Sequence, residues 1–188
     1  SKLEKLALDI CHTNGLLCSS CQGIYLDTEN MDTLYDFCER FLKILARTSA
    51  AFPNNFSPQA QAQLTLQRYS ESLDTVLNEK RLYQEEDCSL LACTDSSLEL
   101  SMMFRNCWVK RLPRQALMAK LKKYKNTLHT AGLLCAENES EELRNLLFRA
   151  GVVRVTGGNT MSQTYCGMPH DGEYALRRYV KVVSSVLS

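Results

Sequence analysis

Segments with helical periodicity alternate with short apolar runs along this chain, and this alternation constrains its fold more than any other feature. Strands separated by helices of this length are typical of an α/β sheet with parallel strand pairs. We expect helices near residues 1–13, from 27–30 to a turn-rich break at 50–58, and over 59–78, 113–123, 139–149 and 172–187. We expect strands over 23–26, 82–94, 98–104, 107–109, 127–134 and 152–155. No strong linker divides these segments, so a single domain over residues 1–188 is predicted.

Particular residues indicate where the helices start, end and face the core. Ser1 is expected to cap the first helix, and either Asp27 or Asn30 the second. Gly151 is expected to end the helix over 139–149. Helical spacing predicts inward-facing side chains at Leu64, Leu73 and Val76, and in the last helix at Leu176, Val180 and Val183.

The composition argues against several classes of partner. The formal net charge of +1 gives no electrostatic basis for binding nucleic acid or an anionic membrane. No apolar run approaches the roughly 18 to 20 residues that a membrane helix needs, so no membrane span is expected. The first residues lead into an amphipathic pattern rather than a signal-peptide core, which predicts a cytoplasmic location. The 9 cysteines are odd in number and irregularly spaced, which favours reduced thiols over a disulfide framework.

Cys18 lies in a short Gly-containing loop between the first helix and the strand at 23–26. A thiol held there can act as a nucleophile if it is exposed and if nearby N–H groups stabilise an oxyanion. Gly15 allows a tight bend, and Ser19 and Ser20 are small enough to leave room above the sulfur. The residues alone favour the alternative that Cys18 is one of several inert thiols.

Two further interpretations of the same loop stay open. Cys18-x-x-Cys21 has the spacing of a redox pair, although a strand follows it where a thioredoxin-like pair would begin a helix. A zinc site would need a second pair, and Cys88-x4-Cys93 lies within an apolar strand-like run. No metal site is therefore expected.

The remaining polar candidates lie near the end of the chain. His170 and Asp171 precede the last expected helix, so Asp171 either caps that helix or joins His170 in a cleft. His12 and His129 fall within a predicted helix and a predicted strand and are expected to be structural. No glycine-rich phosphate-binding turn is present in the sequence.

Several stretches together resemble a known family. Gly15-Leu16-Leu17-Cys18, followed by the strand at 23–26, resembles the nucleophile segment of the aldehyde dehydrogenase superfamily. Within it, Leu8-Asp9-Ile10 and Cys18-Ser19-Ser20-x-Gln22 are similar to the long-chain acyl-CoA reductases of the LuxC type. Residues 128–132, 151–155 and 169–172 resemble the closing segment of that family. The chain departs from the family in lacking Gln-x-Cys before the nucleophile, and Glu-x-Phe-Gly is absent, as suits the reductase branch.

The resemblance implies an aldehyde-dehydrogenase-like catalytic domain, a mostly parallel sheet flanked by helices, without the N-terminal nucleotide-binding half. It implies reduction of long-chain fatty acyl-CoA to fatty aldehyde through an acyl-Cys18 thioester. Gly15, Ser19 and Ser20 would lie around the oxyanion, and His170 and Asp171 would shape the cleft. NADPH or NADH would bind mainly the absent half. The expected partners are the fatty acyl-CoA substrate, this nucleotide-binding half and further copies of the chain in a homo-oligomer. An aldehyde dehydrogenase, an acyl-phosphate reductase, a thiol redox protein and an interaction module are the alternatives.

Overall fold

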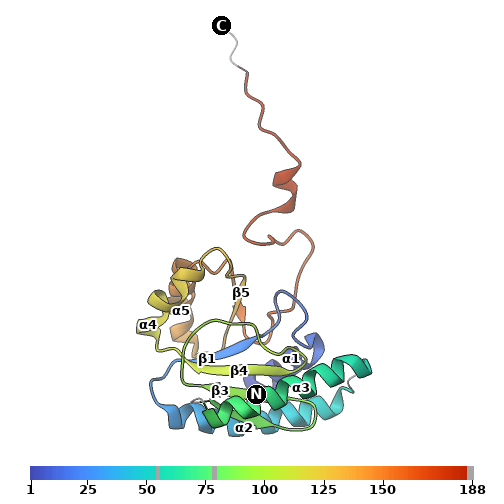
Figure 1. Cartoon of the computed structure of the whole chain (residues 1–188). Helices are drawn as coiled ribbons and strands as arrows, with labels where there is room; N and C mark the ends of the chain where they lie inside the picture. Colours follow the sequence, from blue (N-terminus) through green and yellow to red (C-terminus); the bar gives the residue numbers. More distant parts are fainter. Residues whose placement is uncertain (54–55, 78–79, 186–188) are drawn as a thin grey trace.

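The computed structural model describes residues 1–53, 56–77 and 80–185 (Figure 1). The α-helices are α1 (Lys2–Thr13), α2 (Met31–Ala51), α3 (Pro58–Leu77), α4 (Arg114–Leu121) and α5 (Glu137–Ala150), and short 3-10 helices follow at η1 (Lys122–Tyr124) and η2 (Ala175–Arg178). The strands are β1 (Gly23–Leu26), β2 (Lys80–Gln84), β3 (Ser89–Cys93), β4 (Asn106–Arg111), β5 (Thr130–Leu133) and β6 (Arg154–Gly157).

The strands form two sheets. The larger sheet has the order β1-β4-β3-β2, in which β4 runs parallel to both neighbours and β2 is antiparallel to β3. The smaller sheet pairs β5 with β6 in parallel. The chain is thus a mixed α/β protein with mostly parallel strand pairs, as the alternation of segments predicts.

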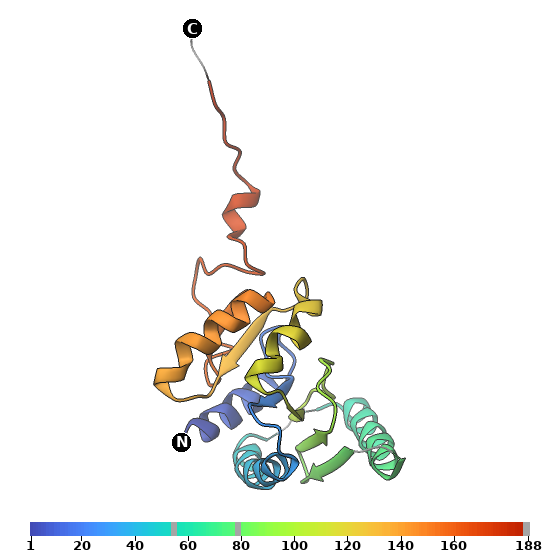
Figure 2. The ribbon, with the colours of Figure 1, turned by 90° about the vertical axis from the view of Figure 1, so that its left-hand side faces the viewer.

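Each sheet has its own helices and its own core. Helices α1 and α2 pack on each other and, together with the larger sheet, enclose a core around Ile10, Phe41 and Val109. Helices α4 and α5 pack on each other beside β5 and β6 around a second core that includes Leu117 and Leu147. Figure 2 shows α2 and α3 on opposite sides of β2 and β3, and α5 lies on the far side of β1 from both.

The predicted helix caps are confirmed where they can be compared. Ser1 and Glu4 form a capping box at the start of α1. Asn30 caps α2, its Oδ1 accepting from the N–H of Asp32 at 2.7 Å, whereas Asp27, the other candidate, binds Arg114 instead. Gly151 ends α5 with φ 108°, a left-handed conformation that glycine adopts without steric cost.

The expected strand over 98–104 is wrong, since this segment is a loop apart from an isolated bridge at Met103. The carbonyl of Glu99 accepts from the Trp108 indole at 2.9 Å, and its carboxylate binds the fully buried ammonium of Lys110. Three successive residues from Met103 to Arg105 then adopt positive φ. The carbonyl and carboxylate of Glu99 are thus already engaged, and the backbone after it is not extended. The segment therefore cannot pair as a strand.

Other expected strands differ mainly in length. The run over 82–94 is a hairpin of β2 and β3, closed by the N–H of Glu85 donating to the carbonyl of Cys88 at 3.0 Å. The strand expected over 107–109 lies within β4, the one over 127–134 is shortened to β5, and the one over 152–155 is shifted to β6.

The inward face predicted for α3 is partly wrong. Leu64 is buried, but Leu73 and Val76 are exposed. The side of α3 that meets the sheet carries polar groups after Leu64: Arg68 donates to Asn106, and Glu71 pairs with Lys80 at 3.4 Å. Polar contacts thus replace apolar ones along this side, which hydrophobic periodicity cannot predict.

The final helix expected over 172–187 is also wrong within the described residues, and 186–187 lie outside them. Only η2 is helical, and the chain then projects away from the body of the protein (Figure 1). Leu176, Val180 and Val183 are 77%, 67% and 89% exposed. An amphipathic helix gains most of its stability from packing, and no described element covers this one.

Candidate active site

The end of α1 builds the loop that carries Cys18. Asn14 and Gly15 both have positive φ, 50° and 71°, which reverses the chain after the helix. Ser20 then closes the loop: its Oγ accepts from the N–H of Leu17 at 2.9 Å, and its own N–H donates to the carbonyl of Leu17. Cys18 is left at the tip with an exposed thiol, while Ser19 and Ser20 are buried beneath it.

The N–H groups around the thiol differ in what they can still bind. The N–H of Leu17 is committed to Ser20. Among the described residues, the N–H groups of Cys18 and Ser19 donate to no partner. Two adjacent free donors at a nucleophile are the arrangement that stabilises an oxyanion.

A strained segment fixes this loop from behind. The N–H of Phe104 donates to the carbonyl of Asn14 at 2.6 Å, and a Cβ on Gly15 would lie only 3.2 Å from Met103 Cα. Met103, Phe104 and Arg105 have φ of 60°, 48° and 67°. Non-glycine residues rarely adopt this conformation, and strain of this kind gathers at functional sites.

Gln22 adds a second clamp. Its side-chain amide donates to the carbonyl of Gly15 at 2.8 Å and accepts from the Ser101 hydroxyl at 2.8 Å. The loop is therefore held at its start by Asn14, at its end by Gln22, and internally by Ser20. Fixed backbone donors are worth more than mobile ones, because they need no reorganisation during the reaction.

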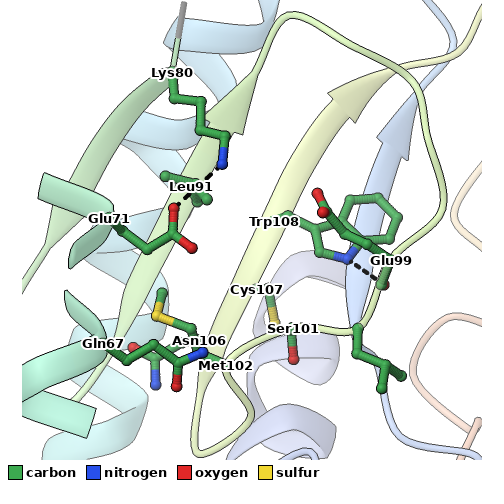
Figure 3. A pocket seen from close by; sticks show the side chains of 11 residues that line it. Gln67, Glu71, Lys80, Leu91, Glu99, Ser101, Met102, Asn106, Cys107 and Trp108 are labelled. Carbon is green, nitrogen blue, oxygen red and sulfur yellow. Dashed lines mark hydrogen bonds and ion pairs between the residues drawn. The ribbon is translucent and has the colours of Figure 1, made fainter. Parts of the chain in front are cut away.

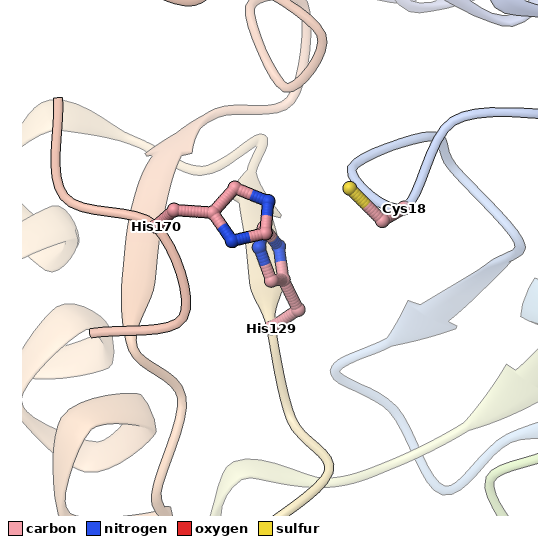
Figure 4. A group of neighbouring side chains, drawn as sticks. All are labelled: Cys18, His129 and His170. Carbon is pink, nitrogen blue, oxygen red and sulfur yellow. The ribbon is translucent and has the colours of Figure 1, made fainter. Parts of the chain in front are cut away.

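Two histidines from distant segments lie beside the thiol. His129 immediately precedes β5, and His170 comes from the loop after β6. The sulfur of Cys18 and one nitrogen from each ring lie within 4.8 Å of one another. Figure 4 shows the sulfur pointing toward the two rings. The rings themselves meet edge to face, with centroids 5.4 Å apart.

Asp171 joins the two rings. One carboxylate oxygen lies 3.2 Å from Nε2 of His129, and the other lies 3.0 Å from Nδ1 of His170. Nδ1 of His129 lies 2.6 Å from the Thr130 hydroxyl. Asp171 is thus a partner of the histidines and not the cap of a final helix. A carboxylate in this place fixes the orientation of both rings.

The loop that carries His170 is anchored on the helix before Cys18. Ser162 donates from both its N–H and its hydroxyl to Oδ1 of Asp9, a buried residue of α1. Met161 enters the larger core, and its carbonyl accepts from Arg154 at 2.7 Å. Both sides of the site therefore rest on α1.

Cys21 points elsewhere. It is buried, and its thiol donates to the carbonyl of Gly23 at 3.6 Å, while Cys18 is exposed. Both thiols are free. A redox pair needs the second thiol to reach the first, so this arrangement does not favour that interpretation.

A cavity of about 500 Å³ opens beside the histidines. Its lining includes His129 and Asp171, the apolar side chains of Phe148 and Val153, and Lys125. A volume of this size lies within the range of small-molecule sites. Another pocket, between α3 and the larger sheet, has a volume of only about 60 Å³ and is lined by Glu71, Lys80, Trp108 and others (Figure 3). It is too small for a substrate.

Sequence analysis placed Cys18, Gly15, Ser19, Ser20, His170 and Asp171 at the candidate site, and the structure brings all six into one region. It missed His129, which was expected to be structural, and Arg105, whose Nε donates to Oδ1 of Asn14 at the start of the Cys18 loop. Nothing in the spacing of His129 could indicate this position, because β5 and the Cys18 loop meet only in the folded chain.

An exposed thiol beside two histidines, on an α/β scaffold and next to a cavity, is an arrangement in which a cysteine can act as a nucleophile on acyl or carbonyl groups. Comparison with family models then identifies the family. The model described as "Acyl-CoA reductase (LuxC)" matches residues 1–182, and the chain belongs to this family of long-chain acyl-CoA reductases. A search among curated proteins found no match. Among the described residues, no helix is both long and apolar enough to cross a membrane.

Proposed function

We propose that this chain carries the acyl-transfer site of a fatty acyl-CoA reductase, with Cys18 as the nucleophile. The observation that carries the proposal is the exposed Cys18 sulfur within 4.8 Å of nitrogens of His129 and His170. A nucleophilic thiol needs a base within reach, and such contacts are often looser before substrate binds. Family membership supplies the acyl-CoA substrate class.

The acyl transfer proceeds in two steps. An imidazole of the pair accepts the proton of Cys18, and the thiolate attacks the thioester carbonyl of acyl-CoA to form a new carbon–sulfur bond. The oxyanion lies against the free N–H groups of Cys18 and Ser19. The carbon–sulfur bond to CoA then breaks, the imidazolium returns its proton to the departing CoA thiolate, and acyl-Cys18 remains. Loss of one oxyanion donor typically costs about 2.7 to 4 kcal/mol of transition-state stabilisation.

The surroundings suit an acyl group. Leu16 and Leu17 are exposed on the Cys18 loop, and Phe148 and Val153 are exposed in the lining of the cavity beside the histidines. Apolar side chains that remain uncovered next to a reactive group favour an apolar substrate. We assign the acyl chain to this apolar surface.

A reduced nicotinamide, NADPH or NADH, supplies the hydride that converts the acyl-enzyme to aldehyde in the complete reaction. The described residues offer no glycine-rich turn to hold its phosphates. These residues do not by themselves fit the phosphates of that cofactor.

The test is intact mass spectrometry of the chain after incubation with a long-chain acyl-CoA, without nicotinamide. We expect one acyl adduct on the native chain and on Cys166→Ala, which removes the other exposed thiol. We expect none on Cys18→Ala. An adduct that persists on Cys18→Ala, or no adduct on the native chain, would contradict the proposal.

A further inference from the structure

The Cys18, His129 and His170 side chains offer one sulfur and two imidazole nitrogens within 4.8 Å of one another (Figure 4). Thiolate and imidazole are the ligands that zinc prefers in proteins. Zinc bonds of about 2.0–2.1 Å to nitrogen and 2.3 Å to sulfur place tetrahedral donors roughly 3.3 to 3.8 Å apart. The three donors therefore need to approach by only about 1 Å.

The site has the freedom to make this approach. Cys18 and His170 are exposed and lie on loops, whereas His129 is set against β5 with its side chain 20% exposed. Two movable ligands can thus close on a fixed one. Gly172, with φ 79°, follows Asp171 in the tight turn that the bridge between His170 and Glu173 closes.

His129 holds a nitrogen that lacks a hydrogen bond. Its Nε2 is shielded from solvent and makes no hydrogen bond to any described residue, although Asp171 Oδ1 lies 3.2 Å away. A shielded imidazole nitrogen without a hydrogen bond is available as a metal ligand. The Thr130 hydroxyl contacts the other nitrogen of His129, Nδ1, at 2.6 Å, and Asp171 lies 3.0 Å from Nδ1 of His170; contacts of this kind orient metal-binding histidines.

A second group of donors in the chain shows the contrast. Cys93, Asp95 and Glu99 also converge, but the ammonium of Lys110 already binds both carboxylates, at 3.0 Å from Asp95. A cation of the chain itself occupies that position. No lysine or arginine pairs with Asp171 among the described residues.

We propose that Cys18, His129 and His170 form a Zn²⁺ site with three protein ligands and an open fourth position. Binding forms one zinc–sulfur and two zinc–nitrogen bonds, and the thiol proton passes to solvent without any change of oxidation state. The ion then holds the sulfur that acyl transfer requires. Metal binding stands by itself, while the resulting inhibition rests on the proposed function.

The first experiment titrates the chain with Co²⁺ as a spectroscopic substitute for Zn²⁺. We expect one equivalent to give a thiolate-to-cobalt charge-transfer band and intense visible bands of four-coordinate cobalt, both displaced by Zn²⁺. The matched controls are Cys166→Ser and His12→Ala, which remove an exposed thiol and an exposed imidazole from elsewhere and should leave the spectrum unchanged.

The ligand variants decide the assignment. Cys18→Ser should abolish the charge-transfer band, and His129→Ala and His170→Ala should each weaken Co²⁺ binding at least tenfold. Circular dichroism identifies any variant that fails to fold, and His170→Ala on the exposed loop is the safest of the three. A charge-transfer band that survives in Cys18→Ser, no cobalt binding by the native chain, or unchanged affinity in both histidine variants would overturn the site.

A second readout separates this site from the proposed function. Zn²⁺ should slow alkylation of Cys18 by iodoacetamide at least tenfold, as measured by peptide mass, while alkylation of Cys166 stays unchanged. Cobalt binding without any acyl adduct would support the metal site and contradict the acyl-transfer proposal. An acyl adduct that forms at an undiminished rate in saturating Zn²⁺ would overturn the inhibition.

Discussion

Arg105 donates from Nε to Oδ1 of Asn14 across 2.8 Å, and this contact ties the Cys18 loop to the start of β4. The Arg105 side chain is buried, and its Nη1 also donates to the hydroxyl and carbonyl of Ser49 at the end of α2. One guanidinium therefore joins the Cys18 loop, α2 and the larger sheet.

Replacing Arg105 by Leu should destabilise the chain by about 3 kcal/mol, since it leaves several buried acceptors without a donor. Urea unfolding followed by circular dichroism measures the loss. Arg47→Leu is the matched control, because Arg47 forms an exposed pair with Glu4 that is worth less than about 1 kcal/mol. Equal losses in the two variants would show that Arg105 has no special structural role.

Native-state alkylation should separate the cysteines by exposure. Cys18 and Cys166 are exposed, Cys135 is intermediate, and the others are buried. Burial raises the pKa of Cys38 and that of Cys88 to about 12, which suppresses their thiolate forms at neutral pH. Iodoacetamide at pH 8 followed by peptide mass should modify Cys18 and Cys166 first and Cys135 more slowly.

Unfolding in urea provides the control for this labelling, because all cysteines should then react. Fast modification of Cys38 or Cys88 in the native chain would contradict the core described here.

Gly23→Ala should cost about 3 kcal/mol or prevent folding. A Cβ at this position would lie about 2.0 Å from the Trp108 indole. The indole cannot easily move, because it donates to the Glu99 carbonyl and packs edge to face on Tyr25. Thermal unfolding, monitored by fluorescence of the single tryptophan, measures the effect.

Gly157→Ala is the control for that substitution, since its Cβ would meet only Asn159 and Thr160 side-chain atoms at 3.3 and 3.4 Å. It should change stability by less than about 1 kcal/mol. A Gly23→Ala variant as stable as Gly157→Ala would mean that Trp108 is packed differently.

Asp95 should make the free energy of unfolding fall as the solution becomes acidic. Burial alone would raise the pKa of Asp95, but hydrogen bonds from Ser97 and Lys110 outweigh it and lower that pKa to about 2. Because the unfolded value is about 3.9, the stabilisation is fully present above about pH 4 and is lost as the pH falls through about 2. Asp95→Asn should remove this acid dependence and lower the free energy of unfolding by about 1 kcal/mol at pH 7. The loss is small because the carboxylate is half-exposed and solvent screens its interactions.

Lys110 should make the free energy of unfolding fall as the solution becomes strongly basic. Burial would lower the pKa of Lys110, but hydrogen bonds to Glu99 and Asp95 raise it above its usual value. Its contribution is present below about pH 10.4 and is lost as the pH rises through the higher folded-state pKa. Urea unfolding from pH 2 to 11 measures both the loss of stability in acid and the loss in base. Asp36→Asn, an exposed control, should leave the loss of stability in acid in place.

The sequence determined the local structure of this protein. Hydrophobic periodicity, the Ser1 and Asn30 caps and Gly151 located α1, α2 and α5 within a few residues. Short-range chemistry decides these features, because a cap or a helical face involves residues only a few positions apart. The loop motif around Cys18 and its family resemblance were likewise visible in the sequence, and the family is confirmed. The aldehyde-dehydrogenase-like fold, the absent nucleotide-binding half and the homo-oligomer stay predictions.

Only the tertiary structure decided how distant segments meet. Glu99 lies in a loop because Lys110 and Trp108 bind it, and the last segment is not helical because nothing packs on Leu176 and its neighbours. His170 lies beside Cys18 on a loop that Ser162 anchors to Asp9 of α1, and β5 brings His129 to the same place. Periodicity reports burial along one element, whereas a site of this kind depends on which elements lie beside each other, and long-range packing alone determines that.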